Sequence, residues 1–522
     1  MRRWLLFLAA IALLLHLRSV GYGFVTWDDG LLVFRNPAIR ELSFQTLRHI
    51  FTSYDPELYI PLTFLSYQIE YQIAGFSPAI FHFTNVLLHA LNTVLVFLIA
   101  GSLWRDRRIG FLVALLFAIH PLHTEAVSWI SARKDLLSAL FFLSSIRLYH
   151  LFVARVHEPL LRHWTLWLSI ICFALSLLAK VSTVPLPLLL LLMDFSSGRK
   201  ISRAVLLEKI PYVVLAVVFV VIAIVGKSNA LSSLPFLSTL SLAMQATVFL
   251  LSKLLLPLGL SVMYPVRDVP TLLSPFTIIA ATSIIAVLLV ALFSWRKDRR
   301  VTLGIVWFFV MVAPMVATFA KGPEVALTSD RYAYLPSIGM LAILSLAGVR
   351  LWDRFAKTNI IRGIALGAFI VLLLLFSMLT LRWSSVWANS QALYEDALSK
   401  YPESASVHYN LGLEYQWKGK PDDAIAHYTS ALALRPVYPD AHNNIGTILL
   451  DRGDNDGAIK ELRIAIDQNP RHALAYANLA AVYGKKGMYE DAVRALQKSL
   501  ELDPRKKKEA EDLRRLVEEM KK

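Results

Sequence analysis

The sequence predicts an all-α protein, with about eleven transmembrane helices followed by a solenoid of short helix pairs. Two observations lead to this fold class. The 522 residues are 56% hydrophobic and only 17% charged, with a mean hydropathy of +0.54, which is too apolar for a soluble chain of this length. Beyond Arg382 the apolar runs give way to a polar and periodic tail.

Twelve apolar runs precede that tail and are candidates to cross about 30 Å of hydrocarbon. They lie near residues 4–24, 80–102, 109–122, 134–153, 163–181, 183–195, 210–226, 240–258, 273–294, 302–320, 333–350 and 360–382. The first follows a basic start without a small-residue cleavage site, so we expect an uncleaved span. The single cysteine, Cys172, supports neither a disulfide nor a thiolate metal site within one chain.

Basic clusters between the runs predict the topology. Lys and Arg gather at 1–3, 104–108, 199–200, 296–300 and 350–357, as expected of cytoplasmic loops, and this pattern argues against a nucleic-acid partner for the net charge of +15. If all twelve runs crossed, cluster 296–300 would lie outside. We therefore expect 240–258 not to cross.

Eleven crossings would place three polar stretches and the tail on the outer face, with the N-terminus inside. These stretches are 25–79, the segment that begins at His120, and 321–332. The compact tail and short loops favour a bacterial inner membrane with a periplasmic tail. The alternative, in a eukaryote, is the endoplasmic reticulum membrane with a lumenal tail.

Proline spacing defines the tail. Pro402, Pro436, Pro470 and Pro504 are 34 residues apart, the period of tetratricopeptide helix pairs. We predict a membrane domain at 1–383 and a repeat domain at 384–522, with repeats near 405–438, 439–472 and 473–506. Residues 388–400 resemble a preceding helix, and 506–521 a polar capping helix. Such repeats bind peptides or proteins on their concave face.

Two adjacent carboxylates, Asp28 and Asp29, open the first outer loop. Like charges so close repel, which favours one as a base or a metal ligand. The alternative is a solvated aspartate turn before Gly30.

The stretch HPLHTEAVSWISARKD, residues 120–135, follows the third apolar run. Pro121 ends the helix, so its ionisable residues are expected at the mouth of a cavity rather than in lipid. They are His120, His123, Glu125, Arg133 and Asp135. Hydrogen bonding to a phosphate or sugar is favoured. A metal held by His120, His123 and Glu125, or a purely structural cap, are the alternatives.

Two cations from distant segments are expected at the same face. Lys180 ends the fifth run, and Arg331 lies in the motif DRYAYLPSIG before the eleventh. Cations beside an outer cavity suit a phosphate leaving group, to which arginine offers bidentate contacts. Lys253 and Arg267 are weaker candidates.

These motifs, together with the outer repeats, resemble the transmembrane and tetratricopeptide repeat-containing protein O-mannosyltransferases, which act on cadherins, and their bacterial relatives. The resemblance covers nearly the whole chain, and HPLHTEAV followed by Arg-x-Asp is its most specific element. The chain departs from the family at Lys180-Val181, where Lys-Glu is common, and in its three repeats, which are fewer than in animal members.

The resemblance implies a GT-C glycosyltransferase fold and transfer of a sugar, mannose, from a polyprenyl-phosphate donor at the outer face to a protein Ser or Thr hydroxyl. It makes Asp29, with Asp28 as its neighbour, the catalytic base. It assigns His120, His123, Glu125, Arg133, Asp135, Lys180 and Arg331 to the donor and its phosphate. The repeats would bind the acceptor or a partner protein, and a divalent metal stays open.

Two other functions remain as alternatives. One is a polysaccharide polymerase or O-antigen ligase, which does not need the Asp28-Asp29 pair. The other is a non-enzymatic, membrane-anchored repeat scaffold, which depends on residues 388–522 and not on single residues such as His120.

Overall fold

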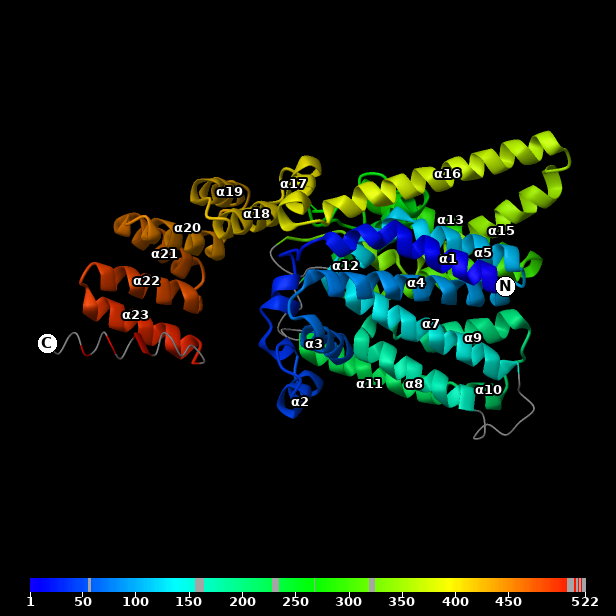
Figure 1. Cartoon of the computed structure of the whole chain (residues 1–522), viewed down its shortest axis with the longest axis horizontal. Coiled ribbons are helices and arrows are strands. Elements are labelled where there is room, and N and C mark those ends of the chain that lie inside the picture. Colours follow the sequence, from blue (N-terminus) through cyan, green and yellow to red (C-terminus); the bar gives the residue numbers. More distant parts are fainter. Residues whose placement is uncertain are drawn as a thin grey trace. The chain divides into compact units, whose positions relative to one another are not determined.

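A computed structural model describes residues 1–54, 58–154, 164–227, 234–266, 268–318 and 324–504, together with 511, 512, 515 and 518. It divides into two units, Met1–Leu393 and Tyr394–Lys522 (Figure 1). The protein is all-helical as predicted, and within the described ranges the single β contact is an isolated bridge between Pro265 and Ala326. Arg267 and most of the expected capping helix at 506–521 lie outside the described residues.

Unit 1 is built from long apolar helices joined by short turns. The longer helices are α1 (Arg2–His16), α3 (Pro61–Ala74), α4 (Pro78–Leu103), α5 (Arg107–Ile119), α7 (Arg133–Val153), α8 (Trp164–Ala179), α9 (Leu186–Ser197), α11 (Ile210–Lys227), α12 (Phe236–Leu255), α13 (Pro275–Lys297), α14 (Arg299–Val312), α15 (Ser337–Phe355) and α16 (Asn359–Val386). The short elements are η1 (Leu17–Gly21), η2 (Gly30–Phe34), η3 (Pro37–Ile39), α2 (Phe44–Thr52), η4 (Pro121–His123), α6 (Thr124–Ser128), η5 (Ile130–Ala132), η7 (Val181–Thr183), α10 (Arg203–Leu207), η8 (Ala313–Thr318) and η9 (Asp330–Ala333).

Eight helices of the described chain are long and apolar enough to cross a membrane, or nine if α5 and the segment Pro121–Ser128, bent by 57°, form one span. This is fewer than the eleven expected, because α8 and α9 have only 16 and 12 residues and α15 is not among the eight. Helix α12, the run expected not to cross, is one of the eight and has 20 residues. Its length and composition therefore do not distinguish it from the other spans.

Basic residues collect at one end of unit 1, which we call the basic end. Arg108, at the start of α5, pairs with Asp353 in α15 at 2.8 Å. The Trp104 indole, after α4, donates to the Arg300 carbonyl in α14 at 3.1 Å, and Arg105 donates to the Ser197 carbonyl in α9 at 3.1 Å. Figure 1 shows the N-terminus and the α15–α16 connection at this end, opposite α2 and α3. The predicted cytoplasmic clusters therefore share one end.

The opposite end, which we call the cavity end, brings the other turns together. Asp29 accepts a hydrogen bond from Ser131, and Trp129 stacks on Trp387 with ring centroids 5.7 Å apart. The Gly23 N–H donates to the Ala388 carbonyl at 3.0 Å. The chain beyond α16 is thus tied to the first loop, and unit 1 extends to Leu393.

The chain between α5 and α7 is a broken helix, and neighbouring side chains satisfy its exposed carbonyls. Asn85 of α4 donates to the Trp129 carbonyl at 2.9 Å, and Tyr67 of α3 to the Ile130 carbonyl at 2.9 Å. Thr380 of α16 donates to the Ile119 carbonyl at 2.7 Å. A helix break in an apolar region needs such partners, since no water is available there. These hydrogen bonds therefore hold residues 120–132 in place.

Unit 2 consists of antiparallel helix pairs. Its helices are α17 (Ser390–Lys400), which begins in unit 1, α18 (Ala405–Trp417), α19 (Pro421–Leu434), α20 (Pro439–Asp451), α21 (Asn455–Gln468), α22 (Ala473–Lys485) and α23 (Tyr489–Leu502). Within a pair the helices approach closely at glycine. A Cβ on Gly412 would lie 2.7 Å from the Tyr428 ring, and one on Gly446 would lie 2.8 Å from Leu462. The small residues of the repeat pattern thus allow this packing.

Candidate active site

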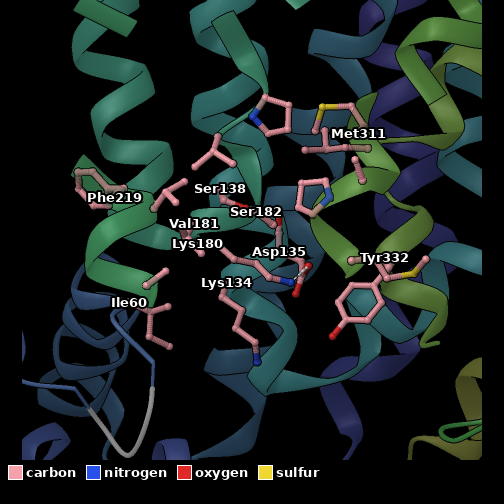
Figure 2. Close-up of a pocket in the computed structure, with 18 of the residues that line it drawn as sticks. Ile60, Lys134, Asp135, Ser138, Lys180, Val181, Ser182, Phe219, Met311 and Tyr332 are labelled. Atoms are coloured by element: carbon pink, nitrogen blue, oxygen red, sulfur yellow. Dashed lines mark hydrogen bonds and ion pairs between the residues drawn. The ribbon is translucent and has the colours of Figure 1, made fainter. Parts of the chain in front are cut away.

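A cavity of about 1190 Å³ opens at the cavity end (Figure 2). One wall is apolar and comes from α11, the end of α14 and η8. The other carries ionisable residues from four separate turns: Asp28, Lys134, Asp135, Lys180 and Arg331. Large, mostly apolar cavities with a few converging polar groups are the usual form of ligand sites. We therefore take this cavity as the candidate active site.

The two aspartates of the first loop lie in different environments. Asp28 lines the cavity, whereas Asp29 is buried with 1% of its surface exposed. Asp29 Oδ2 accepts the Val25 N–H at 2.8 Å, and Oδ1 accepts the Ser131 N–H at 2.9 Å and the Ser131 hydroxyl. Burial raises the pKa of Asp29 to about 6. The nearby Asp28 charge also raises this pKa, whereas the hydrogen bonds from Val25 and Ser131 lower it. Both oxygens of Asp29 are thus occupied, and Asp28 is the carboxylate at the cavity.

Arg331 and Glu125 form a buried ion pair beside the cavity. The Arg331 guanidinium contacts Glu125 Oε1, and the backbone N–H of Arg331 donates to Glu125 Oε2 at 3.2 Å. The guanidinium also lies over the Trp129 ring, 4.8 Å from its centroid. Its Nε is buried and has no partner among the described residues. Glu125 therefore fixes Arg331, which keeps a donor that the protein does not satisfy.

Lys180 pairs with Asp135 on the same side, and Figure 2 shows the two side chains meeting. Asp135 thus supplies the acidic partner that Val181 does not. Asp135 Oδ2 is buried and has no hydrogen-bond partner in the described part of the chain. The pair leaves little net charge at this point of the wall.

Lys134 is the cavity cation that the sequence analysis did not select. Its ammonium donates to the Ser131 carbonyl at 2.6 Å and lies 5.1 Å from the Trp129 centroid. It interacts electrostatically with Asp28. The sequence signal for Lys134 is its place between Arg133 and Asp135 in the motif Ala-Arg-Lys-Asp.

Arg133 points away from the cavity wall and into the protein. Its guanidinium pairs with Glu70 at 2.8 Å, bonds the Phe81 carbonyl at 2.7 Å, and contacts Asn85 through Nε. It lies over the Tyr67 ring at 5.1 Å. The side chain is fully buried. Arg133 therefore joins α3, α4 and α7 and is not among the residues that line the cavity.

The two histidines of the motif are also buried outside the cavity lining. His120 Nδ1 accepts the Leu122 N–H at 3.2 Å, and its Nε2 lies 2.9 Å from the Leu254 carbonyl of α12. His123 Nδ1 lies 2.8 Å from the Phe117 carbonyl, and its Nε2 lies 3.0 Å from the Ser337 hydroxyl. Each ring nitrogen thus has a partner that holds the broken helix together.

The metal alternative finds no support in this arrangement. Within the described ranges, no group of three or more His, Cys, Asp or Glu side chains is placed to hold a metal ion. Glu125 is bound to Arg331. The histidine nitrogens face carbonyls, a backbone N–H and a hydroxyl. The three residues therefore do not form a set of metal ligands.

The fold and the cavity define a polytopic membrane protein with a charged cavity at one end of its helices and a tetratricopeptide-repeat unit after them. Tetratricopeptide-repeat families match residues 414–470 and 473–506. The resemblance to the transmembrane and tetratricopeptide repeat-containing protein O-mannosyltransferases is confirmed, at about a quarter identity over most of the chain.

Three such relatives illustrate the similarity. Protein O-mannosyl-transferase TMTC4 of Homo sapiens is 26% identical over 439 residues, which cover 70% of this chain and 56% of the relative. Human TMTC1 is 25% identical over 422 residues, covering 70% and 47%. F38B6.6 of Caenorhabditis elegans is 25% identical over 453 residues, covering 81% and 61%. The chain thus spans about half the length of the curated relatives it matches.

Proposed function

We propose that this protein is a membrane glycosyltransferase that moves a sugar, mannose, from a polyprenyl-phosphate donor to a Ser or Thr hydroxyl of a protein on the outer face. The observation that carries the proposal is the cavity. Its apolar wall and its cluster of cations match the two parts of a lipid phosphate. The distant similarity to protein O-mannosyl-transferases supports the same class of reaction.

The apolar wall suits the polyprenyl chain. It is formed by consecutive turns of α11 between Ala216 and Ile224 and by residues 309–315 of α14 and η8. Many α11 side chains are exposed in unit 1, with Val217 at 57% and Ile224 at 58%. The donor lipid would enter sideways and lie along α11, because such a surface is stable only against hydrocarbon.

The phosphate would be held by Arg331, Lys134 and Lys180. Arg331 offers its unsatisfied Nε and is already oriented by Glu125 and Trp129. Charge-assisted hydrogen bonds of this kind are about twice as strong as neutral ones. The same cations would stabilise the negative charge that develops on the phosphate as it leaves.

We assign the base to Asp28 and a positioning role to Asp29. Asp28 lines the cavity, whereas Asp29 uses both oxygens to hold the first loop on Ser131. This assignment reverses the order that the family resemblance implied. Glu125, Arg133, His120 and His123 likewise act through other residues, since their side chains are buried.

The reaction then follows from these positions. Asp28 accepts the proton of the acceptor hydroxyl, and the hydroxyl oxygen forms a bond to the anomeric carbon. The bond from that carbon to the phosphate oxygen breaks, and polyprenyl phosphate leaves with the electron pair. A single displacement inverts the anomeric configuration. Because the phosphate leaves as a stable anion, the step needs no general acid.

We further propose eleven crossings, with the basic end cytoplasmic and the cavity end outside. The eleven passes would run alternately between the two ends and would be α1, α4, α5, α7, α8, α9, α11, α13, α14, α15 and α16. Helix α12 would begin and end outside. Its Leu254 carbonyl lies beside His120, and its Gln245 donates to Thr277 in the first turn of α13 at 2.9 Å. The repeat unit would then follow α16 on the outer face, periplasmic in a bacterium.

The repeats would bind the acceptor or a partner protein through a row of polar side chains on α18, α20 and α22. Asn478 donates to Asn443 at 2.8 Å and to Thr447 at 3.2 Å, and Asn444 lies 3.3 Å from the Tyr409 hydroxyl. Primary amides both donate and accept, as a peptide backbone does. An extended peptide is therefore the ligand that suits this row.

Transfer of labelled mannose from polyprenyl-phosphate mannose to outer-face proteins tests the proposal. Membranes with the wild-type chain are compared with Asp28→Asn, Asp29→Asn and the matched control Asp353→Asn at the basic end. We expect labelling in the wild type and the control, and loss in Asp28→Asn at equal protein level. Equal labelling in all four would remove both aspartates from the chemistry. If no protein is labelled but deletion of 394–522 abolishes a cellular phenotype, the chain is a scaffold.

A further inference from the structure

A second cavity, of about 370 Å³, lies at the basic end and plays no part in the proposed reaction. Three turns build it: the α4–α5 turn, the last turn of α9, and the α13–α14 turn. Its lining contains three arginines, Arg105, Arg299 and Arg300, and one carboxylate, Asp298. We infer that this cavity binds a phosphate group, that of an anionic phospholipid headgroup at the membrane edge or of a free phosphate compound.

The charge of the cavity favours an anion. Asp298 is already matched, since it accepts hydrogen bonds from Arg300 Nε at 3.0 Å and Nη2 at 3.1 Å and also pairs with Arg350. Arg105 and Arg299 therefore face the cavity without a carboxylate in its lining to balance them. A concave surface of one charge concentrates the opposite ion.

Arg299 is held in place by aromatic rings. Its guanidinium lies 5.4 Å from the Trp295 centroid and 5.8 Å from that of Phe195, and these two rings are stacked at 4.5 Å. Stacking engages the face of a guanidinium, whereas its five N–H donors lie in the plane. The arginine is thus ordered before a ligand arrives, and ordering in advance lowers the entropic cost of binding.

Arg105 is held by an unusual backbone. Its φ of 55° makes it the single non-glycine residue with positive φ among the described residues. The Trp104 indole fixes this turn on the Arg300 carbonyl, and Arg105 Nη2 reaches the Ser197 carbonyl at 3.1 Å. Such a conformation is strained for a residue that carries a side chain. It directs the guanidinium across the end of α9 and into the cavity lining.

The position of the cavity favours a lipid headgroup. Three candidate spans, Pro78–Leu103, Pro275–Lys297 and Arg299–Val316, end or begin at its rim. Phe293, on the last turns of α13, has 69% of its surface exposed, and Phe195 has 39%. Exposed aromatic residues beside cations are typical of the membrane interface. Acyl chains of a bound phospholipid would pass over these rings.

The test uses the purified full chain in phosphatidylcholine nanodiscs, with or without phosphatidylglycerol, and a third arm with inorganic phosphate. The readouts are the Tm and the phospholipid adducts seen by native mass spectrometry. The variants are Arg299→Ala and Arg105→Gly, which keeps the left-handed backbone. Arg296→Ala is the matched control, because this exposed arginine one turn away does not line the cavity.

We expect phosphatidylglycerol to raise the Tm of the wild type and of Arg296→Ala equally. Arg299→Ala and Arg105→Gly should each weaken its binding about tenfold, the loss of one charged hydrogen bond. If inorganic phosphate alone gives the arginine-dependent shift and displaces the lipid, the phosphate pocket stands and its ligand is a free phosphate compound. An equal loss in Arg296→Ala, or no shift with either probe, would overturn the inference. Both cavity variants must keep the wild-type Tm in phosphatidylcholine alone, which verifies their folding.

Discussion

Asp29 Oδ1 accepts hydrogen bonds from both the backbone N–H and the hydroxyl of Ser131, 102 positions further along the chain. This link ties the first loop to the broken helix between α5 and α7. Asp28, the preceding residue, is thereby set at the cavity wall beside Lys134 and Arg331. The adjacent aspartates thus divide two tasks between them, one structural and one at the cavity.

Replacing Asp29 should therefore disturb the fold more than replacing Asp28. In Asp29→Asn an amide NH₂ faces N–H donors, and we expect a loss of about 1–3 kcal/mol in the free energy of unfolding. Ser131→Ala should cost about 1 kcal/mol, because the backbone N–H remains. Chemical denaturation of the purified protein measures both. Asp28→Asn as unstable as Asp29→Asn would contradict the division of tasks.

Transfer should depend on pH through Asp29. Its pKa is raised from 3.8 to about 6 because it is buried, so the folded protein binds this proton more tightly than the unfolded chain does. As pH falls from about 6 to about 4, this group adds to folding stability. Protonation also removes its charge from the Ser131 contacts, so the rate should fall below about pH 6. Transfer rates measured across this pH range test the prediction. Infrared spectra identify Asp29 as the group that titrates if the band of a protonated carboxyl is present in the wild type and missing in Asp29→Asn.

Glu125 and Arg331 should behave as a unit. Glu125→Gln leaves the Arg331 guanidinium without its charged partner, and breaking a buried pair in this way costs about 3–5 kcal/mol. Arg331→Lys keeps the charge but loses the planar contacts to Glu125 and Trp129, so we expect a higher KM for the donor at near-normal stability. The free energy of unfolding and the KM for the donor, measured on both variants, test these two expectations. Additive effects in the double variant would show that the residues act independently.

Lys180 and Asp135 offer a second cycle. Lys180→Ala leaves the Asp135 carboxylate uncompensated at the cavity wall, where it repels a phosphate. We expect a KM for the donor about tenfold higher, and partial recovery in Lys180→Ala with Asp135→Asn. A double variant no better than Lys180→Ala would mean that Lys180 acts on the donor only by direct contact and not by neutralising Asp135.

Arg133 and Lys134 are adjacent cations with different surroundings, since Arg133 is buried against Glu70 and Lys134 lines the cavity. Each therefore serves as the control for the other. Arg133→Ala removes the partner of buried Glu70 and should cost about 3–5 kcal/mol in stability. Lys134→Ala should spare the fold and weaken donor binding. Thermal unfolding and donor titration of each protein separate the two effects. Weaker donor binding in folded Arg133→Ala, at unchanged KM in Lys134→Ala, would reverse our assignment.

Parts of this architecture follow directly from sequence. The 34-residue proline period predicts the helix pairs of unit 2, because each repeat is a local structure. Charge clusters predict which turns share an end, since Arg108, Arg300 and Arg350 do meet there. Short spans such as α8 and α9 were harder to count, because proline and Lys180 divide one long apolar run.

The candidate site was predictable as a region but not residue by residue. Asp28, Asp135, Lys180 and Arg331 converge on one cavity, although they lie up to 303 positions apart. His120, His123 and Arg133 come from the same motif, yet they do not line the cavity, and their partners include backbone carbonyls, the Ser337 hydroxyl and Glu70. The residue types in the stretch 120–135 show that polar groups lie at a helix break. Whether a given side chain faces the cavity or the interior depends on the direction of each short turn within 120–132.

The broken helix also constrains how the protein is made. Its Ile119 carbonyl is satisfied by Thr380 of α16, and its Trp129 ring stacks on Trp387. A ribosome synthesises residue 119 long before residue 380, so the nascent chain holds this break without its final partners while the seven proposed spans from α7 to α15 are inserted. The cavity end therefore matures only when α16 enters the membrane. A chain terminated before α16 would leave the Ile119 carbonyl without this partner in an apolar surrounding.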